Sequence, residues 1–399
     1  MTKISKTVVA VAVLALGVLL SSGRASAKVS YYVVANNDTF PINTVSVYQR
    51  SGSSLVPLTT VQTGGAGTGG GYFAEVTQSV AFDGTQTCLF VGDANSGDIS
   101  AMKASLSSPY LSVVKNYFSP DGDTATNFGL GITVSGKYLY ANYTGGATAP
   151  AIGMWKLEPG CRLSYVMHLV TNGLNGGTVD GMSVTPPGDI LVAAYGDGSV
   201  GTYAVGNGRI ALIGQEMTAG YSVGSFAGSV VTPSLRWAIF GDFSPSNYTQ
   251  LDVAHINTDG SLAPTITYGG TGSLGTGVDS NGIQMSPNNQ FIYIVDSYSG
   301  QETTVSFDIN TGVISYPNAC LTSLKGYNSN WTFASQVATV TGVESGGGLY
   351  ISEGFLTGDS YIALLKVNNT TGCAMEAPNS PFVDTNGGSL ESISSWSRN

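Results

Sequence analysis

The sequence is poor in charged side chains. Lys and Arg together number 15 and Asp and Glu 25, so charged residues make up 10% of the 399 positions, and only two residues are His. An average soluble domain contains roughly 25% charged residues. This shortage excludes a highly charged disordered tail and a coiled coil. The formal net charge of −10 argues against a nucleic-acid partner.

Small and apolar residues are abundant by contrast. The chain contains 54 Gly, and 42% of its residues are hydrophobic, which is enough for a large core. Glycine is nearly twice as frequent as the usual ~7%. Together with the many Ser, Thr, Asn and Tyr, this composition favours an all-β protein in which many short strands are joined by turns.

The first segment has the features of an export signal. Lys3 and Lys6 precede an uncharged apolar run of 13 residues from Val8 to Leu20, and Ala25-Ser26-Ala27 has the small residues that signal peptidase recognises. The run is too short to cross a bilayer, which takes about 20 helical residues. We therefore predict a signal peptide at 1–27 and a secreted or periplasmic domain at 28–399, with a net charge of −13 once three cations are removed.

Export also decides how the four cysteines are interpreted. Their wide spacing contains no CxxC motif, so a zinc site built from them is not expected. In an oxidising compartment they allow two disulfides, in three possible connectivities. Proximity in the sequence favours Cys88 with Cys161 and Cys320 with Cys373. The alternative is four separate buried thiols.

A unit of four short strands recurs along the chain. Its clearest copy begins at Ser280, turns at Pro287-Asn288-Asn289, and continues with the apolar strand Phe291 to Asp296. Two more strands follow, from Thr303 and from Val313. Six complete units fit the chain, and their first strands begin near Gln78, Gly129, Val179, Phe226, Ser280 and Ala334.

The two ends of the chain supply a seventh unit. Leu390 to Trp396 is similar to a first strand, while Tyr31 to Ala35, Thr44 to Tyr48 and Leu55 to Val61 are similar to strands two to four. First strands at 78 and 390 span six periods, so the mean period is 52 residues, which suits a propeller blade with its connections. A single four-stranded sheet cannot cover both of its faces. We therefore predict one domain, a seven-bladed β-propeller of antiparallel blades whose closing blade is shared by both termini.

These features resemble a known family. Seven such units, second strands such as Tyr138 to Ala141, and closure by a short C-terminal strand are similar to the lactonase-like propellers, which include bacterial 6-phosphogluconolactonases and carboxymuconate cyclases. The Gly-rich segment Thr68 to Phe73 is similar to that of exported members. The resemblance implies lactone chemistry at a channel-mouth cluster that includes an Arg-His pair. At the corresponding position this sequence has Phe226-Ala227-Gly228.

Acidic and amide side chains are expected at the hub instead. First strands line the channel of a propeller, so residues at or just before them converge. Asp180 and Glu75 are candidate catalytic residues, because a carboxylate can act as general base on a water. No cofactor is expected, although a carboxylate ring could hold Ca²⁺, and the alternative is that these groups cap exposed strand ends. The candidate substrate-binding residues are Asn127, Asp279, Asn281, Gln336 and Glu391.

Two further features receive no functional assignment. Asp121-Gly122-Asp123 and Asn127 resemble the spacing of a calcium loop, but the bidentate Glu that ends such a loop is missing, so we predict an ordinary loop. His168 lies in the segment from Tyr165 to Leu169, which we predict as an outer strand. We expect an ordinary surface histidine there.

Because the Arg-His pair is absent, we expect a monomeric binding or scaffold propeller with a degenerate lactonase site and no membrane span. Its partner would be a small-molecule lactone, a glycan or another exported protein. The alternative is a hydrolase or cycloisomerase of a neutral sugar-derived or small lactone, with a carboxylate as general base. A carboxylate and amide set that faces a pocket would favour the enzyme, whereas dispersed residues or an exposed aromatic patch would favour binding.

Overall fold

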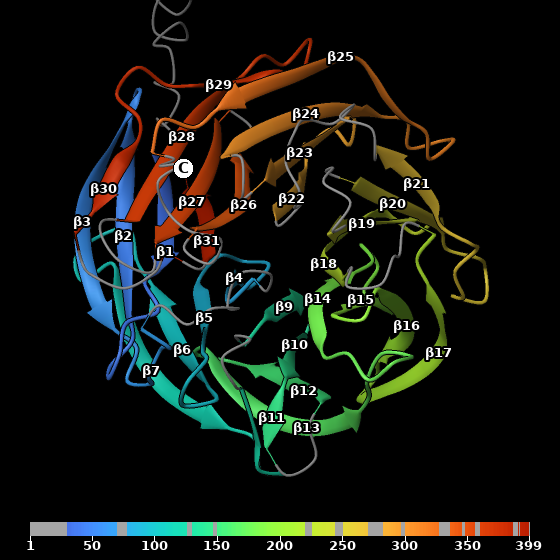
Figure 1. The fold of residues 1–399 in the computed structure, drawn as a ribbon. Coiled ribbons are helices and arrows are strands. Elements are labelled where there is room, and N and C mark those ends of the chain that lie inside the picture. The colour runs from blue at the N-terminus through green and yellow to red at the C-terminus, as the bar shows by residue number, and fades with distance from the viewer. Residues whose placement is uncertain are drawn as a thin grey trace, which may run out of the picture.

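The computed structural model shows a closed ring of seven antiparallel sheets around a common axis (Figure 1). This confirms the predicted seven-bladed β-propeller. Within the described ranges, no helix is long and apolar enough to span a membrane. The structure describes residues 30–69, 78–125, 130–146, 150–219, 226–243, 250–269, 282–296, 300–326, 336–344, 348–355, 360–385, 390 and 392–398.

The first four blades are numbered here from the N-terminus, with the innermost strand given first. Blade 1 contains β31 (Ser392–Arg398), β1 (Ser30–Asn36), β2 (Thr44–Ser51) and β3 (Ser54–Gln62). Blade 2 contains β4 (Val80–Phe82), β5 (Cys88–Asp93), β6 (Asp98–Ala104) and β7 (Leu111–Phe118). Blade 3 contains β9 (Ile132–Ser135), β10 (Tyr138–Tyr143), β12 (Ala151–Glu158) and β13 (Arg162–Val170). Blade 4 contains β14 (Val179–Val184), β15 (Ile190–Tyr195), β16 (Ser199–Gly206) and β17 (Arg209–Met217).

The last three blades follow the same order. Blade 5 contains β18 (Phe226–Ser234), β19 (Trp237–Phe243), β20 (Gln250–His255) and β21 (Ile266–Gly269). Blade 6 contains β22 (Gly282–Met285), β23 (Phe291–Asp296), β24 (Gln301–Phe307) and β25 (Ile314–Ser323). Blade 7 contains β26 (Gln336–Glu344), β27 (Gly348–Phe355), β28 (Ser360–Val367) and β29 (Ala374–Glu376), with β30 (Phe382–Asp384) also paired to β28. Outside the blades, β8 (Asp123–Thr124) pairs with β11 (Gly145–Gly146).

The core lies between the blades. Each cluster of buried apolar side chains combines residues of two neighbouring sheets, as where Phe90 of blade 2 packs with Leu139 of blade 3. The same holds around the ring, and Val33 of blade 1 shares a cluster with Leu364 of blade 7. Burying one such side chain contributes about 1.5–3 kcal/mol. A blade on its own would expose the apolar side chains of both faces to water. Closing the ring covers both faces of every blade.

The chain ends close the ring as predicted. β31 pairs antiparallel with β1, and Trp396 lies opposite Tyr32. Trp396 is buried, its ring is stacked on Tyr32 with centroids 4.7 Å apart, and it lies 5.0 Å from Phe82 of blade 2. The last strand therefore holds the first blade and also contacts the second.

Two disulfides join neighbouring blades. Cys88 at the start of β5 is bonded to Cys161 in the turn before β13, which links blade 2 to blade 3. Cys320 on β25 is bonded to Cys373 just before β29, which links blade 6 to blade 7. The predicted pairing is confirmed, and the alternative of four separate thiols is wrong. Two disulfides indicate an oxidising, extracytoplasmic compartment, while the predicted signal peptide lies outside the described residues.

Candidate functional site

A β-bulge on the innermost strand of blade 4 positions Asp180. On β14, Val179 pairs with Tyr195 and Gly181 pairs with Ala194. Because Ala194 and Tyr195 are consecutive on β15, Asp180 is an extra residue between these two pairs. A bulge bends its strand and turns a side chain away from the regular alternation. The Asp180 side chain is buried and lines the hub of the propeller. The bulge therefore lies at the candidate residue Asp180, whose carboxyl group borders a hollow between blades 2, 3 and 4.

Asp180 borders a small hollow formed by the inner strands of blades 2, 3 and 4. The hollow opens to solvent, and the centre of a water-sized sphere can move through only about 10 Å³ of it. That is room for about one water molecule. The described lining contains one carboxyl group, two amides and no cationic side chain. The lining residues are Gln78, Gly131, Ile132, Asn142, Asp180 and Met182.

Both amides of the hollow are held by backbone groups. Asn142 Oδ1 accepts a hydrogen bond from the Gly131 N–H, and Nδ2 donates to the Val179 carbonyl at 2.6 Å. Asn142 thus bridges blade 3 and blade 4. Gln78 Nε2 donates to the Val80 carbonyl at 3.1 Å. Because an amide NH₂ carries two hydrogens, each side chain keeps a second donor for a ligand.

Burial changes the acidity of Asp180. It raises the pKa of Asp180 to about 7, and the nearby Asp197 carboxylate adds to this shift. A hydrogen bond from the Thr178 hydroxyl, 3.0 Å from Oδ1, acts in the opposite direction. Both protonation states are therefore populated near neutral pH. That is the condition under which a carboxyl group serves as general base or general acid.

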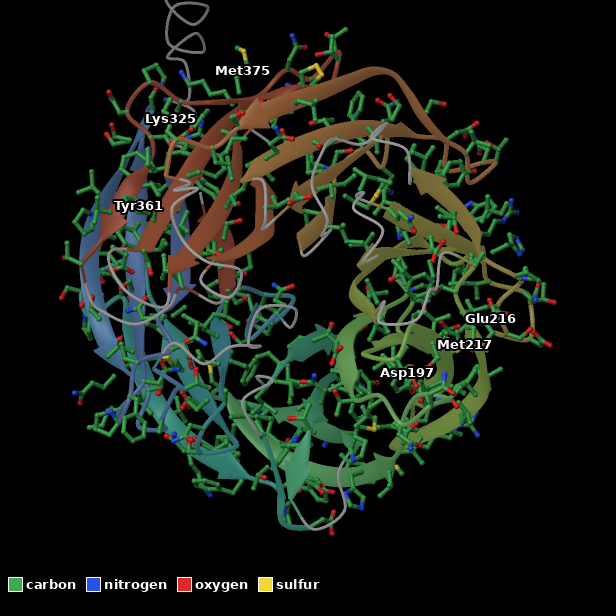
Figure 2. All side chains as sticks on the ribbon, viewed as in Figure 1. Asp197, Glu216, Met217, Lys325, Tyr361 and Met375 are labelled. Atoms are coloured by element: carbon green, nitrogen blue, oxygen red, sulfur yellow. A yellow bond between two sulfur atoms is a disulfide. The ribbon has the colours of Figure 1, made fainter. Side chains whose placement is uncertain are left out.

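Asp197, labelled in Figure 2, has the opposite environment although it belongs to the same blade. Its Oδ2 accepts hydrogen bonds from the backbone N–H of Asn175 at 2.6 Å and of Gly177 at 3.1 Å, and Oδ1 accepts the Ser199 N–H at 3.0 Å. Burial alone would raise the pKa of Asp197, but the hydrogen bonds from Ser199, Asn175 and Gly177 lower it. Asp197 thus stays ionised, while nearby Asp180 is partly protonated and partly ionised at neutral pH. Two carboxyl groups with different pKa values are typical of acid–base sites.

Most of the other predicted site residues cannot be placed. Gln336 opens β26 and pairs with Phe355, but its side chain is outside the described part of the chain. The sequence analysis missed Asn142 and Gln78. Asn142 directly follows the second strand predicted at Tyr138 to Ala141. A polar residue at the end of a buried strand was therefore the feature of the sequence that could have indicated Asn142. The predicted residues that lie outside the described ranges are Glu75, Asn127, Asp279, Asn281 and Glu391.

Comparison with solved structures finds candidate 6-phosphogluconolactonases among the proteins of similar fold. A candidate 6-phosphogluconolactonase from Bacteroides uniformis superposes with a TM-score of 0.66 at 10% identity, covering 92% of this chain and 99% of that one. A protein of unknown function from Desulfotomaculum acetoxidans gives 0.62 at 10% identity, with 91% and 98% covered. A candidate 6-phosphogluconolactonase from Bacteroides fragilis gives 0.56 at 13% identity, with 72% and 80% covered.

The similarity concerns the fold alone. No protein-family model matches the sequence, and no curated protein matches it either. The class defined by the fold is a seven-bladed β-propeller, and its match to candidate 6-phosphogluconolactonase structures confirms the predicted resemblance at the level of the fold.

Proposed function

We propose that the protein binds a small neutral lactone over the mouth of the hub hollow, which has room for the attacking water, and that Asp180 acts as general base for the hydrolysis of this lactone. One observation carries this proposal: the buried Asp180, whose pKa is raised to about 7, borders a hollow together with two amide side chains. A carboxylate with amides around a pocket is the arrangement that favours the enzyme over a passive binder. Its pKa lies where a general base works best at neutral pH.

The chemistry needs only the residues named. The Asp180 carboxylate removes a proton from a water, and the water oxygen adds to the lactone carbonyl. The ring C–O bond then breaks, and the proton held by Asp180 passes to the alkoxide that leaves. The second N–H groups of Asn142 and Gln78 are the described donors that could stabilise the negative charge on the carbonyl oxygen.

The charge of the hollow sets the class of substrate. Its described lining carries no Lys or Arg, the side chains that bind phosphate and carboxylate groups. A sugar phosphate would therefore lack its strongest expected contact and would also approach an acidic protein. Neutral lactones avoid both penalties.

The test is a hydrolysis panel on the purified protein with glucono-δ-lactone, an aryl lactone and a homoserine lactone. We expect turnover that rises through pH 7, as Asp180 loses its proton, and that falls at least about 100-fold in Asp180→Asn. Asp189→Asn, in the turn beyond the other end of β14, is the matched control and should keep full activity. Turnover unchanged in Asp180→Asn would remove Asp180 from the mechanism, and no turnover of any lactone would refute hydrolysis.

Binding without turnover is the second candidate. It is favoured by one observation: Asn142 accepts from Gly131 beside its own blade and donates to Val179 of blade 4, so its amide has a structural role as well. Under this alternative the same lactones would perturb the NMR signals of the hollow without being hydrolysed, and Asp180→Asn would weaken that binding.

A further inference from the structure

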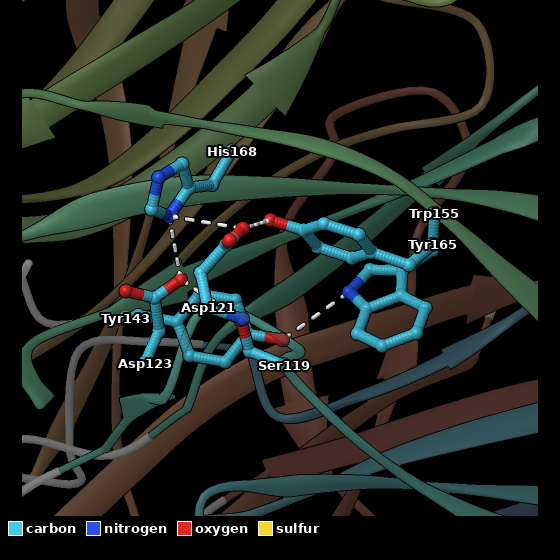
Figure 3. A network of polar contacts seen from close by, with 7 residues as sticks. All are labelled: Ser119, Asp121, Asp123, Tyr143, Trp155, Tyr165 and His168. Atoms are coloured by element: carbon cyan, nitrogen blue, oxygen red, sulfur yellow. Dashed lines mark hydrogen bonds and ion pairs between the residues drawn. The ribbon is translucent and has the colours of Figure 1, made fainter.

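A second polar cluster lies at the outer rim of the propeller, between blades 2 and 3 (Figure 3). Asp121 and Asp123 follow β7, the outermost strand of blade 2, and His168 is on β13, the outermost strand of blade 3. His168 Nδ1 lies 2.7 Å from Oδ2 of Asp123 and 3.6 Å from Oδ2 of Asp121. The predicted loop at Asp121 to Asp123 and the predicted surface histidine His168 thus lie together in one cluster.

Both carboxyl groups converge on the same ring nitrogen. An imidazole nitrogen carries at most one hydrogen, so Nδ1 of His168 can donate to only one of them at a time. Each carboxyl group also has a donor of its own, because the Ser119 hydroxyl lies 2.9 Å from Oδ2 of Asp123 and the Tyr165 hydroxyl donates to Oδ2 of Asp121. These donors orient the two carboxyl groups toward the space beside the imidazole.

Access to the cluster is one-sided. The side chain of Asp123 is fully buried, that of His168 is 20% exposed, and that of Asp121 is 41% exposed. An ion could therefore enter past Asp121 and be held against buried groups. The pairing of Asp123 with Gly146, in the short ladder of β8 and β11, fixes the inner carboxyl group from the backbone side.

We propose that Asp121, Asp123 and His168 form a binding site for a divalent transition-metal ion, with Zn²⁺ as the best match. The donor set is mixed, one imidazole nitrogen and two carboxylate oxygens, and all three lie within 4.8 Å of one another. Around Zn²⁺, with bonds of about 2.0–2.2 Å, neighbouring ligand atoms lie about 3.3 Å apart. The distances of 2.7 Å and 3.6 Å from His168 Nδ1 to the two carboxylate oxygens lie on either side of this value.

The donor set also discriminates between metals. Ca²⁺ takes six to eight oxygen ligands, so an imidazole in the site selects against it. Zn²⁺ accepts nitrogen and oxygen together and is often held by three protein ligands, with a water in the fourth position. Ser119 and Tyr165 would act as positioning residues, since groups that hold the ligands of a metal contribute about 10–100-fold to its affinity.

The test is calorimetric titration of the EDTA-treated protein with Zn²⁺ alone, followed by the absorption spectrum of the Co²⁺-loaded protein. We expect one Zn²⁺ per chain and a Co²⁺ spectrum typical of tetrahedral nitrogen and oxygen coordination. His168→Gln and the partly exposed Asp121→Asn should each weaken Zn²⁺ binding at least about 10-fold. His255→Gln replaces the only other histidine of the chain and serves as matched control.

Three results would overturn the proposal: no Zn²⁺ binding by the intact protein, Zn²⁺ binding that His168→Gln leaves unchanged, or Ca²⁺ binding as tightly as Zn²⁺. Circular dichroism of each variant separates loss of the site from loss of the fold. Loss of binding in a folded Asp121→Asn variant supports the site even if His168→Gln unfolds.

Discussion

The carboxyl group of Asp180 packs against the backbone of Gly196, so closely that a Cβ on Gly196 would lie 2.7 Å from Oδ2 of Asp180. Gly196 directly follows β15, and its N–H donates to the Thr178 carbonyl at 2.9 Å. A side chain at position 196 would therefore require the carboxyl group of Asp180 to shift.

We predict that Gly196→Ala lowers the free energy of unfolding by about 1–3 kcal/mol, because the added methyl group overpacks a buried site. Asp180 would have to move, so lactone binding should weaken as well. Urea unfolding measures the first effect. Gly214→Ala in β17 is the control, since its Cβ would meet nothing within 4 Å. Equal stability of the two variants would contradict the close packing at Asp180.

Glu302 makes stability depend on pH. Its side chain is buried on β24, Oε1 accepts a hydrogen bond from Thr304 at 2.7 Å, and Oε2 has no partner among the described residues. Burial raises the pKa of Glu302 from 4.5 to about 8. The folded protein therefore keeps this proton while the unfolded chain releases it, so this contribution to stability is complete below pH 4.5 and is lost as the pH rises to 8.

We predict that Glu302→Gln removes this part of the pH dependence. Between pH 5 and pH 8, the free energy of unfolding of the variant should rise relative to that of the parent by on the order of 2–4 kcal/mol. Urea unfolding at several pH values measures it. Glu158→Gln is a control, because Lys156 and Ser164 lower the pKa of the half-buried Glu158, so that this group does not titrate in this range. A parallel pH dependence of parent and Glu302→Gln would refute the assignment.

The disulfides should stabilise the ring where they join blades. Replacing Cys88 and Cys161 together by Ser opens a link between residues 73 apart, and we expect a loss of about 2–4 kcal/mol in the free energy of unfolding. The pair Cys320 and Cys373, 53 residues apart, should behave similarly. Thermal unfolding with and without reductant checks both. A parent protein whose melting temperature does not respond to reductant would contradict this role.

Closure of the ring depends on Trp396. We predict that Trp396→Ala costs about 3–5 kcal/mol, because it removes a buried ring that stacks on Tyr32 and contacts Phe82. Trp396→Phe keeps an aromatic ring and should cost clearly less. Chemical denaturation of both variants measures this difference, and equal losses would show that the stacking contact contributes little.

The fold was predictable because it repeats. Strongly apolar second strands such as Phe291 to Asp296, each after a turn signal, recur at a regular period, and alternating strands flank them. Three strands after the predicted signal peptide and one strand near the C-terminus were left over, which required a shared blade. The pairing of Trp396 with Tyr32 confirms this blade. Boundaries were less exact, since the last strand begins at Ser392, two residues after the predicted Leu390.

The sites were less predictable, because they depend on packing between blades. Asp180 was a candidate because of its position on a first strand, but the bulge at this residue and its nearness to the amide of Asn142 are tertiary features. His168 on blade 3 and Asp123 on β8, which follows blade 2, are 45 residues apart, and no local pattern joins them. Sites of this kind can therefore be identified only when the positions of neighbouring blades are known.

The most direct test of the account is a pH titration of the Asp180 carboxyl group by NMR, in protein labelled with ¹³C at the aspartate carboxyl carbons. The Asp180 signal is assigned by its disappearance in Asp180→Asn. We expect a midpoint of about 7, because burial raises the pKa of this carboxyl group. A midpoint near the ordinary value of 3.8 would show an exposed, permanently ionised group and would contradict the proposed site.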